Sequence, residues 1–300
     1  MQNIIEVNQL RKSFGEIRAI NGINLHIPKG TFTAFLGENG AGKSTTIDIL
    51  CTLCDFDEGS VIIDGYHRYH QDNQIRERIG IVFQDSALDD LLTLKENLRI
   101  RSRFYHLNKE QRTLRIKEIS DLLSLDKFIN QKVGTLSGGQ KRKGDIARAL
   151  LSNPSLLILD EATTGLDPKA RLQIWKCIKL LQLKRKISIF LTTHYIEEAA
   201  FADKIIIIQK GKIIEEGTPS SLRDKYTKDY LVLYPHHFNR LETILKEHRI
   251  EYETDYPRIL IKVITCFDSI NIIQRYQIYL KSFEVKLGTL EDAFLSILKQ

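Results

Sequence analysis

The sequence predicts an α/β protein with a largely parallel sheet, followed by a small C-terminal α+β domain. Nearly continuous aliphatic runs alternate with helical patterns, as expected of strands that are buried on both faces. A glycine-rich loop joins one such strand to a helix. A turn signal at Gly217-Thr218-Pro219 precedes a second series of strands and helices, so we expect domains at 1–219 and 220–300.

The elements of the first domain follow from residue type and spacing. Turn signals such as Asn21-Gly22 separate short runs rich in β-branched residues. A helix, TTIDILCTL, is expected directly after the glycine-rich loop. The expected strands are Ile4–Leu10, Ile23–Ile27, Thr31–Leu36, Ser60–Ile63, Ile79–Phe83, Leu156–Leu159, Ile187–Leu191 and Lys204–Gln209.

Between Leu94 and Val133 the pattern becomes charged and helical, which predicts a helical insertion within a helical subdomain of about 94–150. In the C-terminal domain the final helix, LEDAFLSIL, places apolar residues on one face. The other elements expected there are a strand at Leu231–Tyr234, a helix near Arg240–Glu247, a strand at Ile259–Ile264, a helix near Ile270–Leu280 and a strand at Phe283–Leu287.

Composition excludes several classes of protein. With 42% hydrophobic and 27% charged residues, the chain lies in the ordinary globular range, which excludes bulk disorder. The net charge of +6 is too small for a dedicated nucleic-acid binder, so no nucleic-acid partner is expected. The longest apolar run, Tyr230–Tyr234, is far shorter than the roughly 20 residues of a membrane helix.

The N-terminus and the cysteines favour a reducing, cytoplasmic setting. MQNIIEVNQLRKSF lacks the basic-then-apolar order of a signal peptide, and four cysteines are too few for a disulfide framework. Cys51 and Cys54 form a CxxC pair without a second pair of ligands. We therefore expect two small buried helix residues there, not a zinc site.

The glycine-rich loop is a complete match to the phosphate-binding pattern GxxxxGK[ST], and it lies between a strand and a helix. Its glycines allow backbone N–H groups to surround phosphates, and the helix N-terminus adds positive potential. Lys43 is expected at the β- and γ-phosphates, and Ser44 at Mg²⁺. The expected ATP-binding residues of this loop are Gly37, Glu38, Asn39, Gly40, Ala41, Gly42, Lys43, Ser44 and Thr45.

A second motif, LLILDE, ends a strand of four aliphatic residues with two carboxylates. Asp160 at the strand end is expected to hold Mg²⁺ through water. Glu161 follows at the position where an attacking water would lie, so it is a candidate general base. The two motifs together complete one metal site for a nucleoside triphosphatase.

A third motif decides the class. LSGGQ, at Leu136–Gln140, is followed by a helical run, and Ser137 can cap that helix. With this motif between the other two, the chain resembles the ATP-binding subunits of ABC transporters. The resemblance implies a P-loop NTPase fold with a RecA-like core, an antiparallel β-subdomain and a helical subdomain. It also implies that Ser137, Gly138, Gly139 and Gln140 bind ATP held by a second copy in a head-to-tail dimer.

Other positions match the same family. Gln84 in GIVFQD matches the glutamine that senses Mg²⁺ and the attacking water and links to the membrane subunit. Asp167 in GLD matches the dimer-interface loop, and His194 in FLTTHY matches the histidine that contacts the γ-phosphate. Phe14 matches the aromatic residue that stacks on adenine, where Tyr is more frequent in the family. Ala162 replaces a frequent Pro, and Gly144 interrupts the helix after LSGGQ at a cost of about 1 kcal/mol.

Two further stretches resemble the drug-resistance and ABC-2-type export ATPases: DSALDDLLTLKENL after Gln84, and the ending TLEDAFL at Thr289–Leu295. The resemblance implies ATP and Mg²⁺ as ligands, a separate integral membrane permease of ABC-2-like type, and a cytoplasmic place on the inner face of the membrane. An importer ATPase with a regulatory tail and a non-transport ABC ATPase acting on ribosomes or nucleic acid stay open as alternatives. Arg99–Glu118 carries seven Lys or Arg against two Glu, a local excess of +5 that marks a candidate docking surface.

Overall fold

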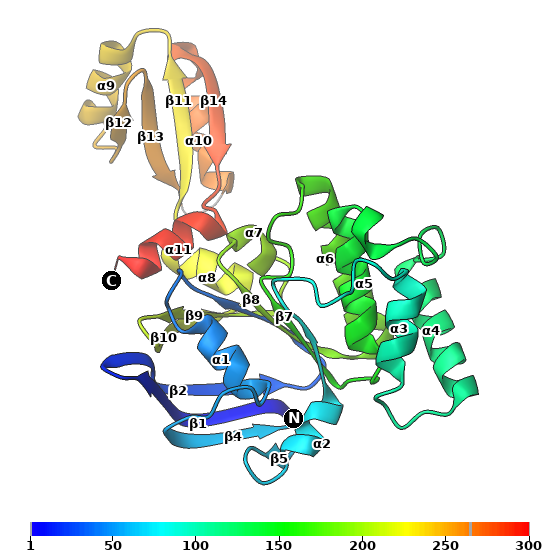
Figure 1. Ribbon diagram of the computed structural model, residues 1–300. Helices are drawn as coiled ribbons and strands as arrows, with labels where there is room; N and C mark the ends of the chain where they lie inside the picture. Colours follow the sequence, from blue (N-terminus) through cyan, green and yellow to red (C-terminus); the bar gives the residue numbers. More distant parts are fainter. Residues whose placement is uncertain (1, 264–265, 300) are drawn as a thin grey trace. The chain divides into compact units, whose positions relative to one another are not determined.

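The computed structural model describes residues 2–263 and 266–299. The chain divides into two compact units, Met1–Thr218 and Pro219–Gln300. Figure 1 labels their helices and strands. Among the described residues, no helix combines the length and the apolar character needed to cross a membrane.

The first unit contains two sheets. The antiparallel sheet has the order β2-β1-β4-β5, and the largely parallel sheet has the order β10-β9-β3-β8-β7-β6. The first is formed by β1 (Asn3–Phe14), β2 (Ile17–Pro28), β4 (Glu58–Ile63) and β5 (Tyr66–His67). The second is formed by β3 (Phe32–Leu36), β6 (Ile79–Val82), β7 (Leu156–Asp160), β8 (Ser188–Thr193), β9 (Lys204–Gln209) and β10 (Lys212–Gly217).

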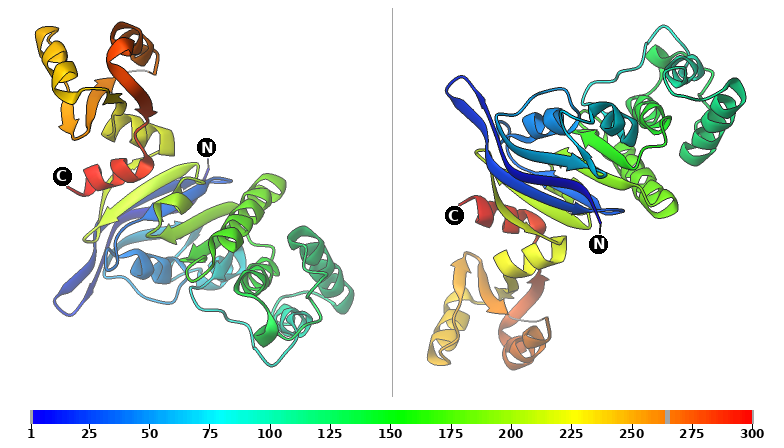
Figure 2. Two further views of the ribbon diagram at one scale, coloured as in Figure 1. Left: turned by 90° about the horizontal axis from the view of Figure 1, so that it is seen from above. Right: turned by 90° about the horizontal axis from the view of Figure 1, so that it is seen from below.

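Helix α1 (Lys43–Leu50) lies between the two sheets, as Figures 1 and 2 show. Its buried face joins a core that contains residues of β1, β2 and β4 on one side and of β3, β7, β8 and β9 on the other. The opposite face of the parallel sheet packs against α6 (Pro168–Arg185), where Trp175 stacks on Phe32 at 6.1 Å between ring centroids. Burial on both faces explains the unbroken aliphatic runs of these strands.

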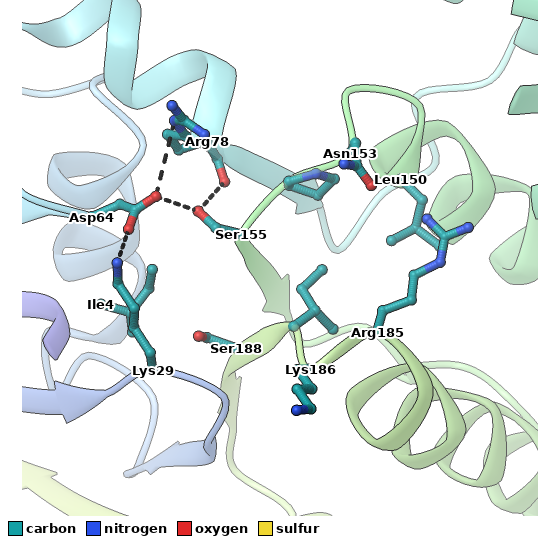
Figure 3. Close-up of a pocket in the computed structure, with 12 residues that line it drawn as sticks. Ile4, Lys29, Asp64, Arg78, Leu150, Asn153, Ser155, Arg185, Lys186 and Ser188 are labelled. Atoms are coloured by element: carbon teal, nitrogen blue, oxygen red, sulfur yellow. Dashed lines mark hydrogen bonds and ion pairs between the residues drawn. The ribbon is translucent and has the colours of Figure 1, made fainter. Parts of the chain in front are cut away.

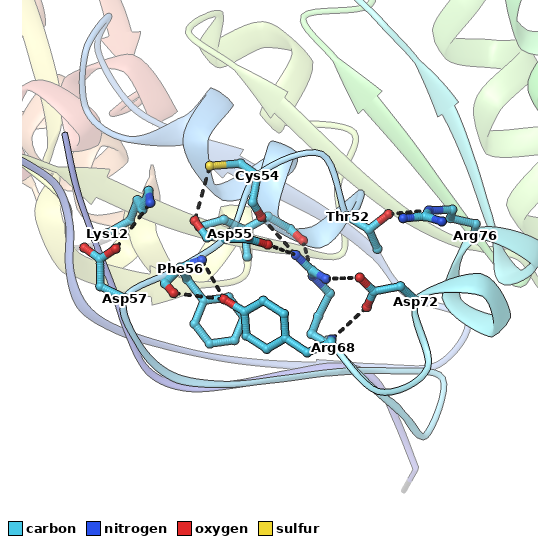
Figure 4. A network of polar contacts seen from close by, with 11 residues as sticks. Lys12, Thr52, Cys54, Asp55, Phe56, Asp57, Arg68, Asp72 and Arg76 are labelled. Carbon is cyan, nitrogen blue, oxygen red and sulfur yellow. Dashed lines mark hydrogen bonds and ion pairs between the residues drawn. The ribbon is translucent and has the colours of Figure 1, made fainter.

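Polar contacts hold the chain that follows α1, as Figure 4 shows. The buried Arg68 donates to the backbone oxygens of Ile49 and Cys54, each at 2.9 Å, and pairs with Asp72 of α2 (Asp72–Arg78). A cation at the C-terminal end of a helix interacts favourably with the negative end of the helix dipole. The expectation of two buried helix cysteines was wrong in part. Cys51 is buried at the C-cap of α1, but Cys54 is half-buried beyond the helix, because α1 ends at Leu50.

The expected helical insertion is confirmed. It contains α3 (Leu94–Ser102), α4 (Lys109–Leu123) and a short 3₁₀ turn at Val133–Thr135. Helices α3 and α4 pack with α5 (Gly138–Leu150). Gly144 of α5 has a packing role there. A Cβ at this position would lie 2.8 Å from Cδ1 of Leu94 and 2.9 Å from Cδ1 of Leu88. Glycine lowers the helix propensity at this position, but its lack of a side chain leaves space for Leu94 and Leu88.

The second unit has a βαββαβ arrangement, with the sheet order β12-β13-β11-β14 and antiparallel pairing throughout. Two helices, α8 (Pro219–Tyr226) and α11 (Leu290–Leu298), pack on each other. The other elements are β11 (Asp229–Pro235), α9 (Phe238–Glu247), β12 (Glu253–Asp255), β13 (Arg258–Val263), α10 (Cys266–Tyr276), a 3₁₀ turn at Gln277–Tyr279 and β14 (Leu280–Lys286).

Several predicted boundaries were wrong. The helix expected near Ile270–Leu280 begins earlier and ends at Tyr276, and Leu280 begins β14. Tyr276 is 1% exposed and joins the core of the unit, so tertiary packing fixes the helix end there. Ile264, the expected end of a strand, lies outside the described residues. On α11, Ala293, Phe294 and Ile297 are buried, as the expected apolar face requires.

Candidate nucleotide site

The predicted catalytic residues follow the carboxyl ends of four parallel strands. Strands β3, β8, β7 and β6 are neighbours in this order, and each adjacent pair is parallel. The loop at Gly37 follows β3, His194 follows β8, and Gln84 lies just after β6. Asp160 is the last residue of β7. In a parallel sheet these ends share one edge, where ligands typically bind.

The glycines of the phosphate loop permit close backbone contacts. A Cβ at Gly37 would lie 2.5 Å from the carbonyl oxygen of Ile208 in β9, and one at Gly42 would lie 2.6 Å from that of Ala19 in β2. Gly40 and Gly42 also have positive φ angles, of 79° and 109°. These conformations favour glycine, and they allow the loop to wrap before α1 begins.

Lys43 is almost fully buried beneath this loop. Its Nζ donates to the carbonyl oxygens of Gly37 at 2.9 Å and Glu38 at 3.0 Å, and lies 3.8 Å from Oε1 of Glu161. Burial lowers the pKa of the Lys43 ammonium, and the charges of Glu161 and Asp160 partly oppose this effect. A buried cation held by carbonyl oxygens is well placed to receive an anionic phosphate.

The two carboxylates at the end of β7 are held by β8. Oδ1 of Asp160 accepts from the Thr192 hydroxyl at 2.6 Å, and the Glu161 N–H donates to the Thr192 carbonyl at 3.1 Å. Burial raises the pKa of Asp160, the Thr192 hydrogen bond lowers it, and nearby Glu161 raises it further. Nδ1 of His194 lies 3.2 Å from Oε1 of Glu161. The structure therefore brings Lys43, Asp160, Glu161 and His194 together.

Other predicted residues are placed at the surface. Ser44, in the first turn of α1, and Gln84, just after β6, are exposed. Phe14 is 52% exposed, and Nζ of Lys12 lies over its ring, 5.1 Å from the ring centroid. Within the described residues, these three side chains make no hydrogen bond or ion pair with the Lys43–Glu161–His194 cluster.

The LSGGQ motif at Leu136–Gln140, called the signature motif below, leads into α5. Ser137 caps the helix in a capping box with Gln140, whose N–H donates to the Ser137 hydroxyl at 3.4 Å while its side chain accepts from the Ser137 N–H at 2.9 Å. The two glycines lie against the next helix. A Cβ at Gly138 would lie 3.1 Å from Leu166, and one at Gly139 would lie 3.0 Å from Ala170.

Asp167 lies close to the residues of the signature motif. Its carboxylate caps α6 by accepting from the Ala170 N–H at 2.9 Å. A cavity of about 250 Å³ lies between the start of α5 and the start of α6, lined by Ser137, Gly139, Gln140 and Asp167 among others. No residue of the phosphate loop lines it, and Figure 1 shows α1 and α5 apart in the fold. The predicted ATP-binding residues thus form two separate groups.

Glu198, in the short helix α7 (Ile196–Ala199), was missed by sequence reasoning. Its side chain is buried and accepts from the Thr163 hydroxyl and, at 2.5 Å, from the Thr193 hydroxyl. Burial raises the pKa of Glu198 to about 7. Thr163 lies two positions after Glu161 and Thr193 directly precedes His194, so one buried carboxyl joins the loops that carry Glu161 and His194. The sequence shows only a Glu four residues after His194, which is no signal by itself.

A cavity of about 350 Å³ lies at the other end of the parallel strands, where they begin. Figure 3 shows residues that line it. The cavity includes Ser155 and Ser188, at the amino ends of β7 and β8. Asp64 there pairs with Lys29 at 2.6 Å and accepts from Ser155 at 2.9 Å. The helices α2, α5 and α6 all end at this cavity. Its arginines and lysines therefore lie near the negative ends of helix dipoles, where positive charge is stabilising. None of the predicted ATP-binding residues lines this cavity.

Comparison with known proteins agrees with this geometry. The family model described as ABC transporter matches residues 20–164. A doxorubicin resistance ATP-binding protein of Mycobacterium tuberculosis is 33% identical over 98% of this chain and 93% of its own length. A Nod factor export ATP-binding protein of Burkholderia lata is 36% identical over 73% of this chain and 72% of its own.

A solved structure of a dimeric ATP-binding cassette is also similar to this chain. An ATP-binding cassette in a post-hydrolysis state, solved as a dimer with ADP and Pi, superposes with a TM-score of 0.64 at 33% identity. The match covers 71% of this chain and 98% of that one. This chain therefore belongs to the ABC transporter family, as an ATP-binding and ATP-hydrolysing subunit. The predicted fold class and family are confirmed.

Proposed function

We propose that this chain powers export as one of two identical ATPase subunits, which work with a separate ABC-2-like permease in the membrane. The observation that carries the proposal is the division of the site into two groups. The cluster at Lys43 and Glu161 and the cavity at Ser137 and Asp167 lie apart in one chain. Two copies placed head to tail would bring one group of each copy to each ATP, which supports dimer closure on two nucleotides.

The residues of the first group suit the phosphates of ATP. The phosphate loop and the start of α1 offer N–H groups, and Lys43 supplies a buried cation. The exposed ring of Phe14 offers a face for adenine. The remaining loop residues, Asn39, Ala41 and Thr45, would contribute backbone and hydroxyl donors.

The residues present also fit Mg²⁺. Ser44, Gln84 and Asp160 offer hydroxyl, amide and carboxylate oxygens, the hard donors that this ion prefers. Burial and the adjacent Glu161 raise the pKa of Asp160, so a divalent cation beside it would stabilise the ionised form. When bound with ATP, the ion would neutralise charge on the β- and γ-phosphates.

Glu161 is the proposed general base, which accepts a proton from the attacking water. The adjacent His194, 3.2 Å away, would orient the γ-phosphate and keep Glu161 in place. Hydrolysis removes the phosphate that joins the two copies, so the dimer opens. Nucleotide binding and release thus shift a two-state equilibrium that the permease converts into movement of cargo.

A groove between the parallel sheet and the helical insertion supports docking of the permease. The groove has a volume of about 320 Å³, and its apolar lining includes Ile79 and Phe83. It also contains Arg76, Arg101 and Arg148, and no carboxylate is among its lining residues. Arg101 and Tyr105 of the lining belong to Arg99–Glu118, the segment with the local charge excess of +5. A permease segment with apolar and acidic side chains would complement it, which would hold the chain at the cytoplasmic face of the membrane.

Co-purification tests the partner. We expect a tagged chain, isolated from detergent-treated membranes of its own cells, to bring with it a polytopic membrane protein that mass spectrometry identifies. Arg101→Glu should remove that protein, whereas Arg115→Glu, on α4 outside the groove, should retain it. Recovery of ribosomes or nucleic acid, with no membrane protein, would contradict the proposal.

Transport direction tests the exporter assignment. Because the M. tuberculosis relative is a doxorubicin resistance protein, doxorubicin is a suitable first probe. Inside-out vesicles that contain the complex should accumulate doxorubicin when ATP is added, and vesicles with the Glu161→Gln chain should not. ATP-driven uptake only by right-side-out vesicles would show an importer.

A further inference from the structure

The segment that carries Gln84, Phe83–Asp90, lies along helix α5 and is held by its side chains. Arg142 of α5 is 7% exposed, and its guanidinium donates to the carbonyl oxygen of Phe83 at 2.7 Å and to that of Gln84 at 2.6 Å. A planar guanidinium can hold two neighbouring carbonyls at once, which an ammonium cannot do in the same geometry. The backbone at Gln84 is therefore fixed from α5.

Asp145, one turn further along α5, holds the other side of Gln84. Its Oδ1 accepts from the Ser86 hydroxyl at 3.0 Å and from the Ala87 N–H at 3.2 Å. Asp145 is buried as well, and its Oδ2 lies 3.8 Å from Arg142. A cation and an anion on one helix thus hold the residues before and after Gln84, and the Gln84 side chain itself stays exposed.

Two more contacts attach the Phe83–Asp90 segment to α5. Lys141 of α5 pairs with Asp90 at 2.6 Å, and the absence of a side chain at Gly144 admits Leu88. The segment is therefore attached to α5 at both ends and in the middle.

Stability alone does not explain the buried pair of Arg142 and Asp145. Burial lowers the pKa of the arginine and raises that of the aspartate, which shows that both charges lose solvation. Apolar residues of similar volume often replace buried ion pairs without loss of stability. In some proteins such a pair is retained because it fixes one particular arrangement of the chain, and the contacts of Arg142 and Asp145 with the Gln84 segment match that role.

We propose that Arg142 and Asp145 are positioning residues that make the signature motif and Gln84 move as one body. Helix α5 begins at Ser137–Gly139, which in the proposed dimer meets the nucleotide of the second copy. A displacement of this helix end is carried through α5 to the backbone at Gln84, which lies beside the chain's own ATP. The inference rests on the proposed function, because it uses the roles assigned there to both motifs.

The test uses the full-length double variant Arg142→Met/Asp145→Val, in which apolar side chains of comparable size replace the two charges. We expect a melting temperature close to that of the wild type. Hydrogen exchange at the Ala87 amide should accelerate at least about tenfold, because its acceptor is lost. In steady-state ATP hydrolysis, kcat should fall about tenfold or more, with KM for ATP changed less than about threefold. A purely structural role would not produce this split.

Controls separate the possible failures. Arg115→Gln removes an arginine of α4 that bonds Asn153, and it should leave exchange at Ala87 and kcat unchanged. Lys43→Ala should abolish turnover, and if it does not, the proposed function fails before the inference is tested. If Lys43→Ala is inactive but the folded double variant keeps wild-type kcat, the positioning role is overturned. Slow exchange at Ala87 in the double variant would overturn it too.

Discussion

The buried carboxyl of Glu198 gives stability a pH dependence that one substitution should remove. In the folded chain its pKa is about 7, against an ordinary value of 4.5. Between these two values the folded chain keeps a proton that the unfolded chain has released, so the free energy of unfolding falls as pH rises. The difference between the two pKa values corresponds to a loss of about 3 kcal/mol in the free energy of unfolding. Most of that loss should occur between pH 5 and pH 7.

Glu198→Gln keeps the shape and both threonine contacts but cannot ionise. We expect the variant to gain about 3 kcal/mol relative to the wild type from below pH 4.5 to pH 8, because the wild type alone loses stability. Urea unfolding followed by fluorescence of Trp175, the single tryptophan and a buried one, measures the difference. Glu197→Gln is the matched control, since Glu197 is exposed on the same short helix. Equal pH slopes for wild type and Glu198→Gln would refute the reasoning.

Three further predictions concern packing and binding. Phe14→Ala should raise KM for ATP about tenfold, in line with the 1–3 kcal/mol of base stacking, and Phe14→Tyr should restore it; an unchanged KM in the alanine variant would exclude stacking. Gly37→Ala should abolish binding of a fluorescent ATP analogue, because the new Cβ would meet the Ile208 carbonyl at 2.5 Å; retained affinity would count against the close approach. Gly144→Leu should lower the free energy of unfolding by about 1–3 kcal/mol, because the larger side chain would overpack against Leu94 and Leu88. Urea titration measures this difference, and an unchanged free energy of unfolding would count against the tight packing.

Much of the fold and the local motifs could be predicted from sequence. The strand–loop–helix at Lys43, the strand ending at Asp160 and the helix capped by Ser137 are each contiguous, so spacing and residue type were sufficient. Edge elements were missed. Strand β10 reads KIIEEG and pairs on one side only. Ile213 and Glu215 are half-buried and Ile214 and Glu216 are exposed, so each face carries one apolar and one charged residue and the usual alternation is hidden.

Contacts between distant segments could not be predicted. Arg142 holds the backbone of Gln84, 58 positions away, and Gly37 meets the carbonyl of Ile208. Glu198 reaches Thr163 across two loops. None of these pairs has a local pattern, because a buried polar contact depends on which segments the topology brings together.

The central claim is that two copies close on ATP and that Glu161 opens them by hydrolysis. Light scattering coupled to size exclusion tests it most directly, on the Glu161→Gln chain with Mg²⁺ and ATP. The account predicts a particle of twice the mass of one chain, with almost no phosphate released, and a single-chain mass when ATP is omitted. A single-chain mass in the presence of ATP, with phosphate release equal to that of the wild type, would contradict it.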